Sequence, residues 1–144
     1  MLSGINHGGN LGCDLYISGT AALRGSAYHR VRSAAVSHYL RRGVPLDWNA
    51  AARRAAAALS EAIDRHDPLG EREFWSINLP HPDPGDPEPA VRLCPVSREP
   101  LPVAYTQEAG GFRYGGVYAE RPREAGSDVD QCFGGAITLS RVPL

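Results

Sequence analysis

The chain has 144 residues, of which 42% are apolar and 22% charged, and its formal net charge is −1. This length fits one domain that buries a core, and the near-neutral charge argues against a protein that binds nucleic acid or an anionic membrane. No apolar run reaches the roughly 20 residues of a membrane span, and the first residues lack the basic and apolar segments of a secretory signal.

The three cysteines, Cys13, Cys94 and Cys132, are far apart in the sequence. Their odd number and the lack of a C-x-x-C pair disfavour both a zinc site and a disulfide framework. We therefore expect a protein of the reducing cytoplasm.

The first 20 residues are rich in glycine and predict a loop, with a short strand at Leu15–Ile17. The tripeptide Ser-Gly-Thr then predicts the start of a helix that extends to about His29. A hydroxyl residue is favoured at the N-cap of a helix, so Ser18 or Thr20 is expected there.

The longest predicted helix covers Trp48 to about Arg65, with Asp47 as its N-cap. Pro68 and Gly70 end it, because neither residue continues a helix cheaply. One stripe at helical spacing is expected to face the core, and its members are Trp48, Ala52, Ala55, Leu59, Ala62 and Ile63.

Short apolar sequences on both sides of this helix predict buried strands, at Ser33–Ser37 and at Phe74–Pro80. The five prolines of Pro80–Pro89 resist helix and central strand alike, so this stretch is expected to be an extended loop. A short strand is predicted near Val91–Cys94.

The C-terminal third predicts strands and turns. Gly115-Gly116 lies between two aromatic-rich arms and predicts a two-residue hairpin turn. Residues 127–135 predict a short helical turn or loop, and residues 136–144 alternate like a final strand. The order of elements fits the back part of an α/β domain with an appended hairpin region.

The sequence SGINHGGNLG, residues 3–12, is the first candidate for chemistry. Its glycines allow positive φ and close approach of the backbone to a ligand. Asn6 and Asn10 supply neutral oxygens, which suit Mg²⁺ or Ca²⁺. The alternative is a glycine-rich turn in which these asparagines cap backbone groups. The sequence matches neither a P-loop nor a dinucleotide-binding motif.

The tripeptide Ser18-Gly19-Thr20 is the second candidate. Free N–H groups and two hydroxyls at a helix start form an anion site, although plain N-capping explains them as well. An oxygen-ligand loop followed within a dozen residues by such a helix start suggests a metal–phosphate site.

Five further residues could have either a chemical or a purely structural role. His7 is either an acid/base group or an exposed loop histidine. Asp14, Asp128 and Asp130 are candidate carboxylates for a metal or a base, with surface or capping roles as the default. Cys13 has no evident base partner and is expected to be a small buried thiol.

These motifs resemble the signature of the SurE survival-protein family of metal-dependent nucleotidases and phosphatases. The family pattern is roughly S-G-x-N-x-G-x-N-x-G, a few residues, then S-G-T. The matching residues here are Ser3, Gly4, Asn6, Gly8, Asn10, Gly12, Ser18, Gly19 and Thr20. The sequences RSAAVS, FWSINLP and GSDVDQCFGGAITLSRVPL look like later family segments, so the resemblance spans most of the chain and corresponds to the C-terminal part of the family.

The resemblance implies an α/β fold, here a partial Rossmann-like domain with a C-terminal β-hairpin extension that exchanges elements within a homo-dimer. It implies a divalent cation, Mg²⁺ or Mn²⁺, with Asn6 as a ligand. It also implies phosphate binding by Ser18, Gly19 and Thr20, in a loop shaped by Gly4, Gly8, Asn10 and Gly12.

The family's metal site is completed by two adjacent acidic residues and a serine, and no Asp-Asp-Gly sequence occurs in these 144 residues. We expect residues 1–144 to form a single partial domain without that acidic loop, with weak cation binding, because hard divalent ions rely on charged oxygens. The implied reaction is hydrolysis of a nucleoside monophosphate or other phosphate monoester, with little or no turnover by this chain alone. We expect the sequence to be a truncated piece of a family member. The alternative is a non-catalytic remnant or one half of a split protein, acting as an oligomerisation module.

Overall fold

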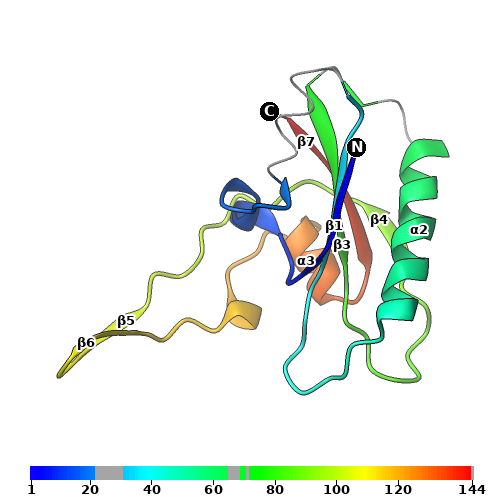
Figure 1. Ribbon diagram of the computed structural model, residues 1–144. Coiled ribbons are helices and arrows are strands. Elements are labelled where there is room, and N and C mark those ends of the chain that lie inside the picture. Colours follow the sequence, from blue (N-terminus) through cyan, green and yellow to red (C-terminus); the bar gives the residue numbers. More distant parts are fainter. Residues whose placement is uncertain (22–30, 65–68, 71, 144) are drawn as a thin grey trace.

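A five-stranded mixed sheet forms the centre of the molecule, with its strands in the order β1-β2-β3-β7-β4 (Figure 1). The computed structural model describes residues 1–21, 31–64, 69–70 and 72–143. Strands β1, β2 and β3 run parallel, β7 is antiparallel to β3, and β4 is parallel to β7. The strands span Leu2–His7 (β1), Ala34–His38 (β2), Glu73–Leu79 (β3), Val91–Leu93 (β4) and Ile137–Pro143 (β7).

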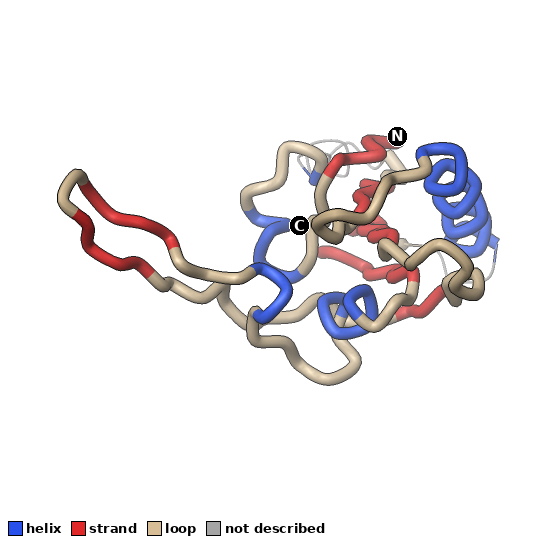
Figure 2. Tube along the Cα trace, turned by 90° about the horizontal axis from the view of Figure 1, so that it is seen from below, coloured by secondary structure: helices blue, strands red, loops and turns tan. Residues whose placement is uncertain are grey.

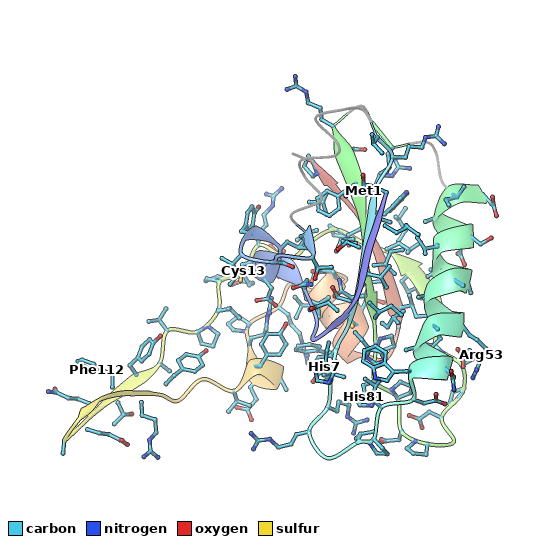
Figure 3. The ribbon with its side chains drawn as sticks, viewed as in Figure 1. Met1, His7, Cys13, Arg53, His81 and Phe112 are labelled. Atoms are coloured by element: carbon cyan, nitrogen blue, oxygen red, sulfur yellow. The ribbon has the colours of Figure 1, made fainter. Side chains whose placement is uncertain are left out.

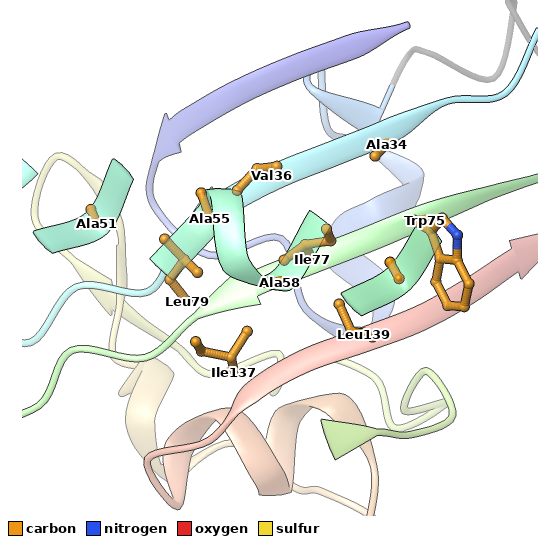
Figure 4. Packing of buried hydrophobic residues seen from close by; sticks show 11 residues of the cluster. Ala34, Val36, Ala51, Ala55, Ala58, Trp75, Ile77, Leu79, Ile137 and Leu139 are labelled. Carbon is orange, nitrogen blue, oxygen red and sulfur yellow. The ribbon is translucent and has the colours of Figure 1, made fainter. Parts of the chain in front are cut away.

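One face of the sheet is covered by the helix α2, Trp48–Asp64 (Figure 1). Asp47 caps this helix, since its Oδ1 accepts hydrogen bonds from the backbone N–H groups of Asn49 and Ala50. The buried side chains of the helix are all alanines, with Leu59 packed beside them, and the sheet contributes larger ones, such as Trp75 and Ile77 (Figure 4). This pairing brings the helix close to the strands and forms the main core. The buried helix residues are Ala51, Ala55, Ala58 and Ala62.

The opposite face of the sheet is partly polar. Successive strand residues point to alternate faces, so the residues between the core positions of β2, β3 and β7 lie on the side away from α2. Several of these are buried hydroxyl or amide side chains, namely Ser37, Ser76, Asn78, Thr138 and Ser140. An apolar group on the same face joins Ala35 and Phe74 to Leu15 and Ala21.

A two-stranded arm projects from the body of the molecule (Figure 2). It consists of β5, Tyr105–Glu108, and β6, Gly111–Tyr114, paired antiparallel. Every residue of both strands is exposed. The arm therefore contributes little to the core of this chain.

Three short helices complete the part of the fold that the structure describes. The 3-10 helix η1, Gly12–Tyr16, follows β1, and a second, η3, Tyr118–Glu120, follows the arm. The helix α3, Asp128–Phe133, precedes β7 and is capped by Ser127. Within the described residues, no helix has both the length and the apolar character needed to cross a bilayer.

Most of the predicted elements are confirmed. The strands at 33–37, 74–80, 91–94 and 136–144, the long helix and the short helical turn at 127–135 all occur within one to three residues of their predicted ends. The proline-rich stretch contains no helix or strand. The helix predicted from Thr20 to His29 falls largely on residues 22–30, outside the described residues.

Three predictions about the elements are wrong. Residues 2–7 form β1 instead of a loop, and the strand predicted at Leu15–Ile17 is the end of η1. The hairpin turn lies at Ala109-Gly110, because Glu108 pairs with Gly111.

The predicted face of the long helix is confirmed in part: Ala55 and Ala62 are buried and Leu59 packs against the core, but the other three predicted residues are exposed. Trp48 is 46% exposed and Ile63 67% exposed, whereas Ala51 and Ala58 are fully buried. Ala52 is exposed as well. Large strand side chains fill the space below the helix, so the helix turns its alanines toward the sheet.

Candidate functional site

The first motif begins in β1, at the edge of the sheet, and ends in the segment that crosses over the polar face. Asn6 pairs with Ser37 and His7 with His38, and the N–H of Gly8 donates to the carbonyl of His38 at 3.0 Å. The start of the glycine loop therefore lies at the carboxyl ends of parallel strands, where ligands bind in open α/β sheets. Figure 3 shows His7 at this end of the molecule, together with His81 beyond β3.

Asn6 has one free acceptor. Its Nδ2 donates to the carbonyl of Gly8 at 2.9 Å, which closes a local turn. Within the described residues no donor reaches Asn6 Oδ1, and the side chain is only partly buried. This oxygen is available to a ligand.

Gly4 is needed for the pairing of β1 with β2. Its φ is +123°, and a Cβ built on it would lie 2.2 Å from the carbonyl oxygen of Val36. Any other residue at this position would push the two strands apart, so this part of the motif shapes the strand rather than a ligand contact.

Asn10 fastens the loop to the polar face of the sheet. Its backbone N–H donates to Asn78 Oδ1 at 2.9 Å, and its carbonyl accepts from Asn78 Nδ2 at 3.1 Å. Its own Nδ2 donates to Ser37 Oγ. The side chain is buried, so its contacts are those of a structural anchor, in line with the loop-shaping role predicted for it.

The η1 turn carries a buried ion pair. Arg121 Nη1 lies 2.8 Å from Asp14 Oδ2, and the Arg121 side chain is fully removed from solvent. The hydroxyl of Tyr118 donates to the same oxygen of Asp14. Burial, reinforced by the neighbouring Asp14 carboxylate, raises the pKa of Tyr118, so its hydroxyl remains a donor.

The second motif follows η1. The Oγ of Ser18 accepts a hydrogen bond from the N–H of Ala21 at 3.2 Å, which is the contact of an N-cap. Gly19 is exposed, and a Cβ built on it would meet no described atom within 4 Å. Within the described part of the chain, no hydrogen bond joins Asn6 to residues 18–20.

The candidate carboxylates have structural partners. Asp128 is fully buried and accepts from the N–H groups of Gly12, Ser97 and Val129. Asp130 accepts from Gly126 N and lies 3.7 Å from Arg123. The default of surface roles is therefore wrong for Asp14 and Asp128, both of which are buried.

The other two candidates are not close to each other. Cys13 is half-buried, not buried as predicted, because it points from η1 into an open cavity of about 580 Å³. His7 is exposed at the end of β1, and its ring lies 6.1 Å from that of Trp48. Figure 3 shows Cys13 on the opposite side of the sheet from α2, which carries Arg53.

Two buried histidines lie at the carboxyl ends of β2 and β3: His38 is the last residue of β2, and His81 follows β3. His38 Nδ1 donates to the carbonyl of Tyr39 at 2.7 Å, and His81 Nδ1 accepts from the N–H of Arg41 at 2.9 Å. Their rings meet edge to face at 5.3 Å. Burial lowers the pKa of His38, so this edge of the sheet holds a neutral imidazole.

A divalent cation does not fit the described residues by themselves. No group of three or more His, Cys, Asp or Glu side chains able to hold a metal occurs among them. Asp14 and Asp128 already neutralise an arginine or accept backbone N–H groups. Asn6 Oδ1 is a neutral oxygen, and a hard cation needs several oxygens, charged ones among them.

Tyr118, Arg121 and Asn78 were not singled out from the sequence. Asn78 lies in the quoted sequence FWSINLP, and its position in a buried strand was a usable signal, because a buried amide needs hydrogen-bond partners. Arg121 and Tyr118 lie more than a hundred residues from Asp14 and follow no motif.

Comparison with known proteins gives a consistent result. The model of the family described as "Survival protein SurE" matches residues 1–101. A Nostoc protein and a Synechocystis protein, both named "Putative 5'-nucleotidase alr3139", are 45% and 44% identical to it over 143 residues. The match covers 99% of this chain but 62% and 63% of those proteins, so the chain spans less than two thirds of their length.

A solved structure shares the fold. The SurE protein from Aquifex aeolicus superposes with a TM-score of 0.76 at 19% identity, over 99% of this chain and 58% of that one. The predicted fold class, α/β with a separate hairpin, is confirmed. The family match covers well over half of the chain, and the chain belongs to the SurE family.

Proposed function

We propose that this chain binds the phosphate group of a nucleoside monophosphate or other phosphate monoester, as the partial domain of a 5'-nucleotidase-type hydrolase. The observation that carries the proposal is the complete S-G-x-N to S-G-T signature in a chain of this family. Two relatives named as 5'-nucleotidases support the reaction class. The expected location is the cytoplasm.

The proposed binding groups are those of Ser18, Gly19 and Thr20. The Ser18 oxygen accepts from Ala21 N–H, which leaves its own hydrogen free to donate to a phosphate oxygen. Backbone N–H groups at this turn add further donors, and the open space beside Gly19 lets an anion approach the backbone.

For the cation, we propose weak binding of Mg²⁺ or Mn²⁺ through Asn6 Oδ1. When bound at a complete site, such an ion polarises phosphoryl oxygens and activates water. The described residues supply this one neutral ligand, so we derive no catalytic step through the metal and expect little or no turnover by residues 1–144.

The test combines binding with turnover. Titration with inorganic phosphate and with AMP should show binding that weakens in Thr20→Val, which removes a hydroxyl at nearly constant volume. Thr106→Val in the exposed arm is the matched control. Absence of binding by the unmodified chain, or equal binding by Thr20→Val, contradicts the proposed role of residues 18–20.

Turnover of p-nitrophenyl phosphate and AMP with Mn²⁺ or Mg²⁺ completes the test. We expect a rate close to that of the buffer. Metal-dependent turnover that disappears in Asn6→Ala would show that the chain is active and that the prediction of inactivity is wrong.

A second candidate function, an oligomerisation module or one half of a split protein, has its own support. The arm exposes Phe112 and Tyr105, and the edge strand β1 borders an apolar groove of about 270 Å³ between Leu2 and Ile63. Mixing the chain with a separately produced piece that carries the acidic loop tests the split form. If neither a complex nor activity results, that form is excluded.

A further inference from the structure

The turn that joins the two motifs, residues 11–14, is held by the C-terminal part of the chain. Arg121 Nη2 donates to the carbonyl of Leu11 at 2.8 Å, and Arg121 Nη1 donates to Asp14 Oδ2 at 2.8 Å. Asp128 Oδ2 accepts from the N–H of Gly12 at 2.8 Å. Arg121 and Asp128, which both follow the arm, therefore hold three of the four residues of the turn: the carbonyl of Leu11, the N–H of Gly12 and the carboxylate of Asp14.

These contacts are buried and specific. The Arg121 side chain has no solvent exposure, and the Asp14 side chain has 12%. A buried guanidinium and carboxylate form short, charge-assisted hydrogen bonds, which restrict the positions of both groups. The Arg121 guanidinium also lies 4.9 Å from the centre of the Tyr118 ring, whose hydroxyl donates to the same carboxylate. We call Tyr118 and Arg121 the arm-base pair.

Gly12 makes this arrangement possible. Its φ is +55°, and a Cβ built on it would lie 2.7 Å from Arg121 Nη2. The last glycine of the first motif therefore leaves room for an arginine that comes from beyond the arm. The space left by Gly12 thus adds to the Arg121–Asp14 ion pair in linking the first motif to the arm-base pair.

Asp14 is close in the chain to the second motif. Its carbonyl accepts from the N–H of Ile17 at 3.2 Å, and Ile17 immediately precedes Ser18. The next residue, Leu15, is buried against Ala21. A shift of Asp14 therefore moves the start of residues 18–20, while Leu15 keeps the rest of the turn in the core.

We propose that Tyr118 and Arg121 are positioning residues for the segment Ser18–Thr20, and that they act on it through Asp14. The inference rests on the proposed function, because it assigns these residues to a phosphate-binding segment. It connects the base of the projecting arm to that segment through two side chains.

Tyr118→Phe is the decisive variant, since it removes one hydrogen bond to Asp14 and keeps the ring. Tyr114→Phe is the matched control, because its hydroxyl donates to the Pro102 carbonyl within the exposed arm. We expect Tyr118→Phe to weaken the affinity for inorganic phosphate and AMP about three- to tenfold, the effect of one lost hydrogen bond. Tyr114→Phe should bind like the unmodified chain.

A control must show that a general loss of stability does not by itself weaken phosphate binding. Leu59→Ala in α2 destabilises the other side of the sheet and should leave phosphate affinity unchanged. Equal weakening by Leu59→Ala, or normal affinity in Tyr118→Phe, overturns the inference.

The amide resonances of Ser18–Thr20, measured without ligand, give a second readout that does not depend on the proposed function. We expect Tyr118→Phe to shift them and Tyr114→Phe to leave them in place; unshifted resonances in Tyr118→Phe overturn the inference. If the unmodified chain binds no phosphate, the proposed function fails, and these amide shifts alone decide whether the arm-base pair positions the segment.

Discussion

The carboxylate of Asp128 shows how much one side chain determines in this chain. It is fully buried and accepts N–H groups from the turn after β1, from the segment after β4 and from its own helix. Burial raises its pKa, while these three N–H groups and Arg121 oppose that effect. The residue thus joins three segments that are far apart in the sequence.

We predict that Asp128→Asn lowers the free energy of unfolding by about 2–4 kcal/mol. An amide keeps one oxygen acceptor but turns its NH₂ group toward an N–H donor that needs an acceptor. Urea unfolding measures the loss. Asp64→Asn, at the exposed end of α2, is the control and should change the free energy by no more than about 0.5 kcal/mol. Equal unfolding midpoints for Asp128→Asn and the unmodified chain would contradict this account.

At the residue scale, the motif positions could be predicted and their partners could not. Asn6 and Ser18 belong to a contiguous pattern that any reader of the sequence can find. Arg121 reaches Asp14 across 107 positions in the chain. Local spacing contains no information on such a contact, because the contact arises only when the sheet brings both segments together.

Among the elements, α2 illustrates what periodicity alone leaves open. The sequence has alanines on every side of this helix, so several stripes fit a 3.6-residue period. The choice between them depends on the sheet, whose large side chains already fill the interface. The existence and bounds of the helix followed from the sequence, whereas its buried face followed only in part: Ala55 and Ala62 were predicted, Ala51 and Ala58 were not.

Overpacking tests this buried face. Ala58 is fully buried against the sheet and Ala56 is exposed on the same helix. We predict that Ala58→Leu lowers the free energy of unfolding by about 1–3 kcal/mol, because the added atoms have no space. Ala56→Leu should be neutral within about 0.5 kcal/mol. Thermal or urea unfolding of both variants measures these changes. If Ala56→Leu were the more destabilising variant, the helix would have to pack on the sheet through its other face.

The strands were predictable to different degrees. β2 and β3 are short apolar runs that sequence patterns identify readily. β1 contains glycine and asparagine, which have low strand propensity, and it becomes a strand because β2 offers a parallel partner. In the arm, the sequence predicted the turn at Gly115-Gly116, but the two strands pair so that the turn lies at Ala109-Gly110.

On the scale of the whole molecule, the arm is the feature that the core of one chain does not explain. Figures 1 and 2 show it extending away from the sheet. Phe112 is 73% exposed and Tyr105 61% exposed. Exposed aromatic side chains on a projecting hairpin are typical of a contact with another chain, and a homo-dimer is what the family resemblance implies.

We predict that Phe112→Ser weakens self-association at least about fivefold, as expected for loss of an aromatic anchor worth more than about 1 kcal/mol. Sedimentation equilibrium of the full chain measures this change. Tyr16→Ser, at a residue that is 75% exposed but lies outside the arm, is the control. A monomeric unmodified chain, or equal weakening by both variants, would rule out the arm as the dimer contact.

The contacts of the η1 turn also set the order in which the protein is completed during synthesis. Arg121 and Asp128 are made 107 and 116 residues after their partners in this turn. At about 5–20 residues per second, this corresponds to a delay of about 5–20 seconds. The turn therefore gains these two contacts only after the residues beyond the arm have been made, and a nascent chain that ends within the arm lacks both of them.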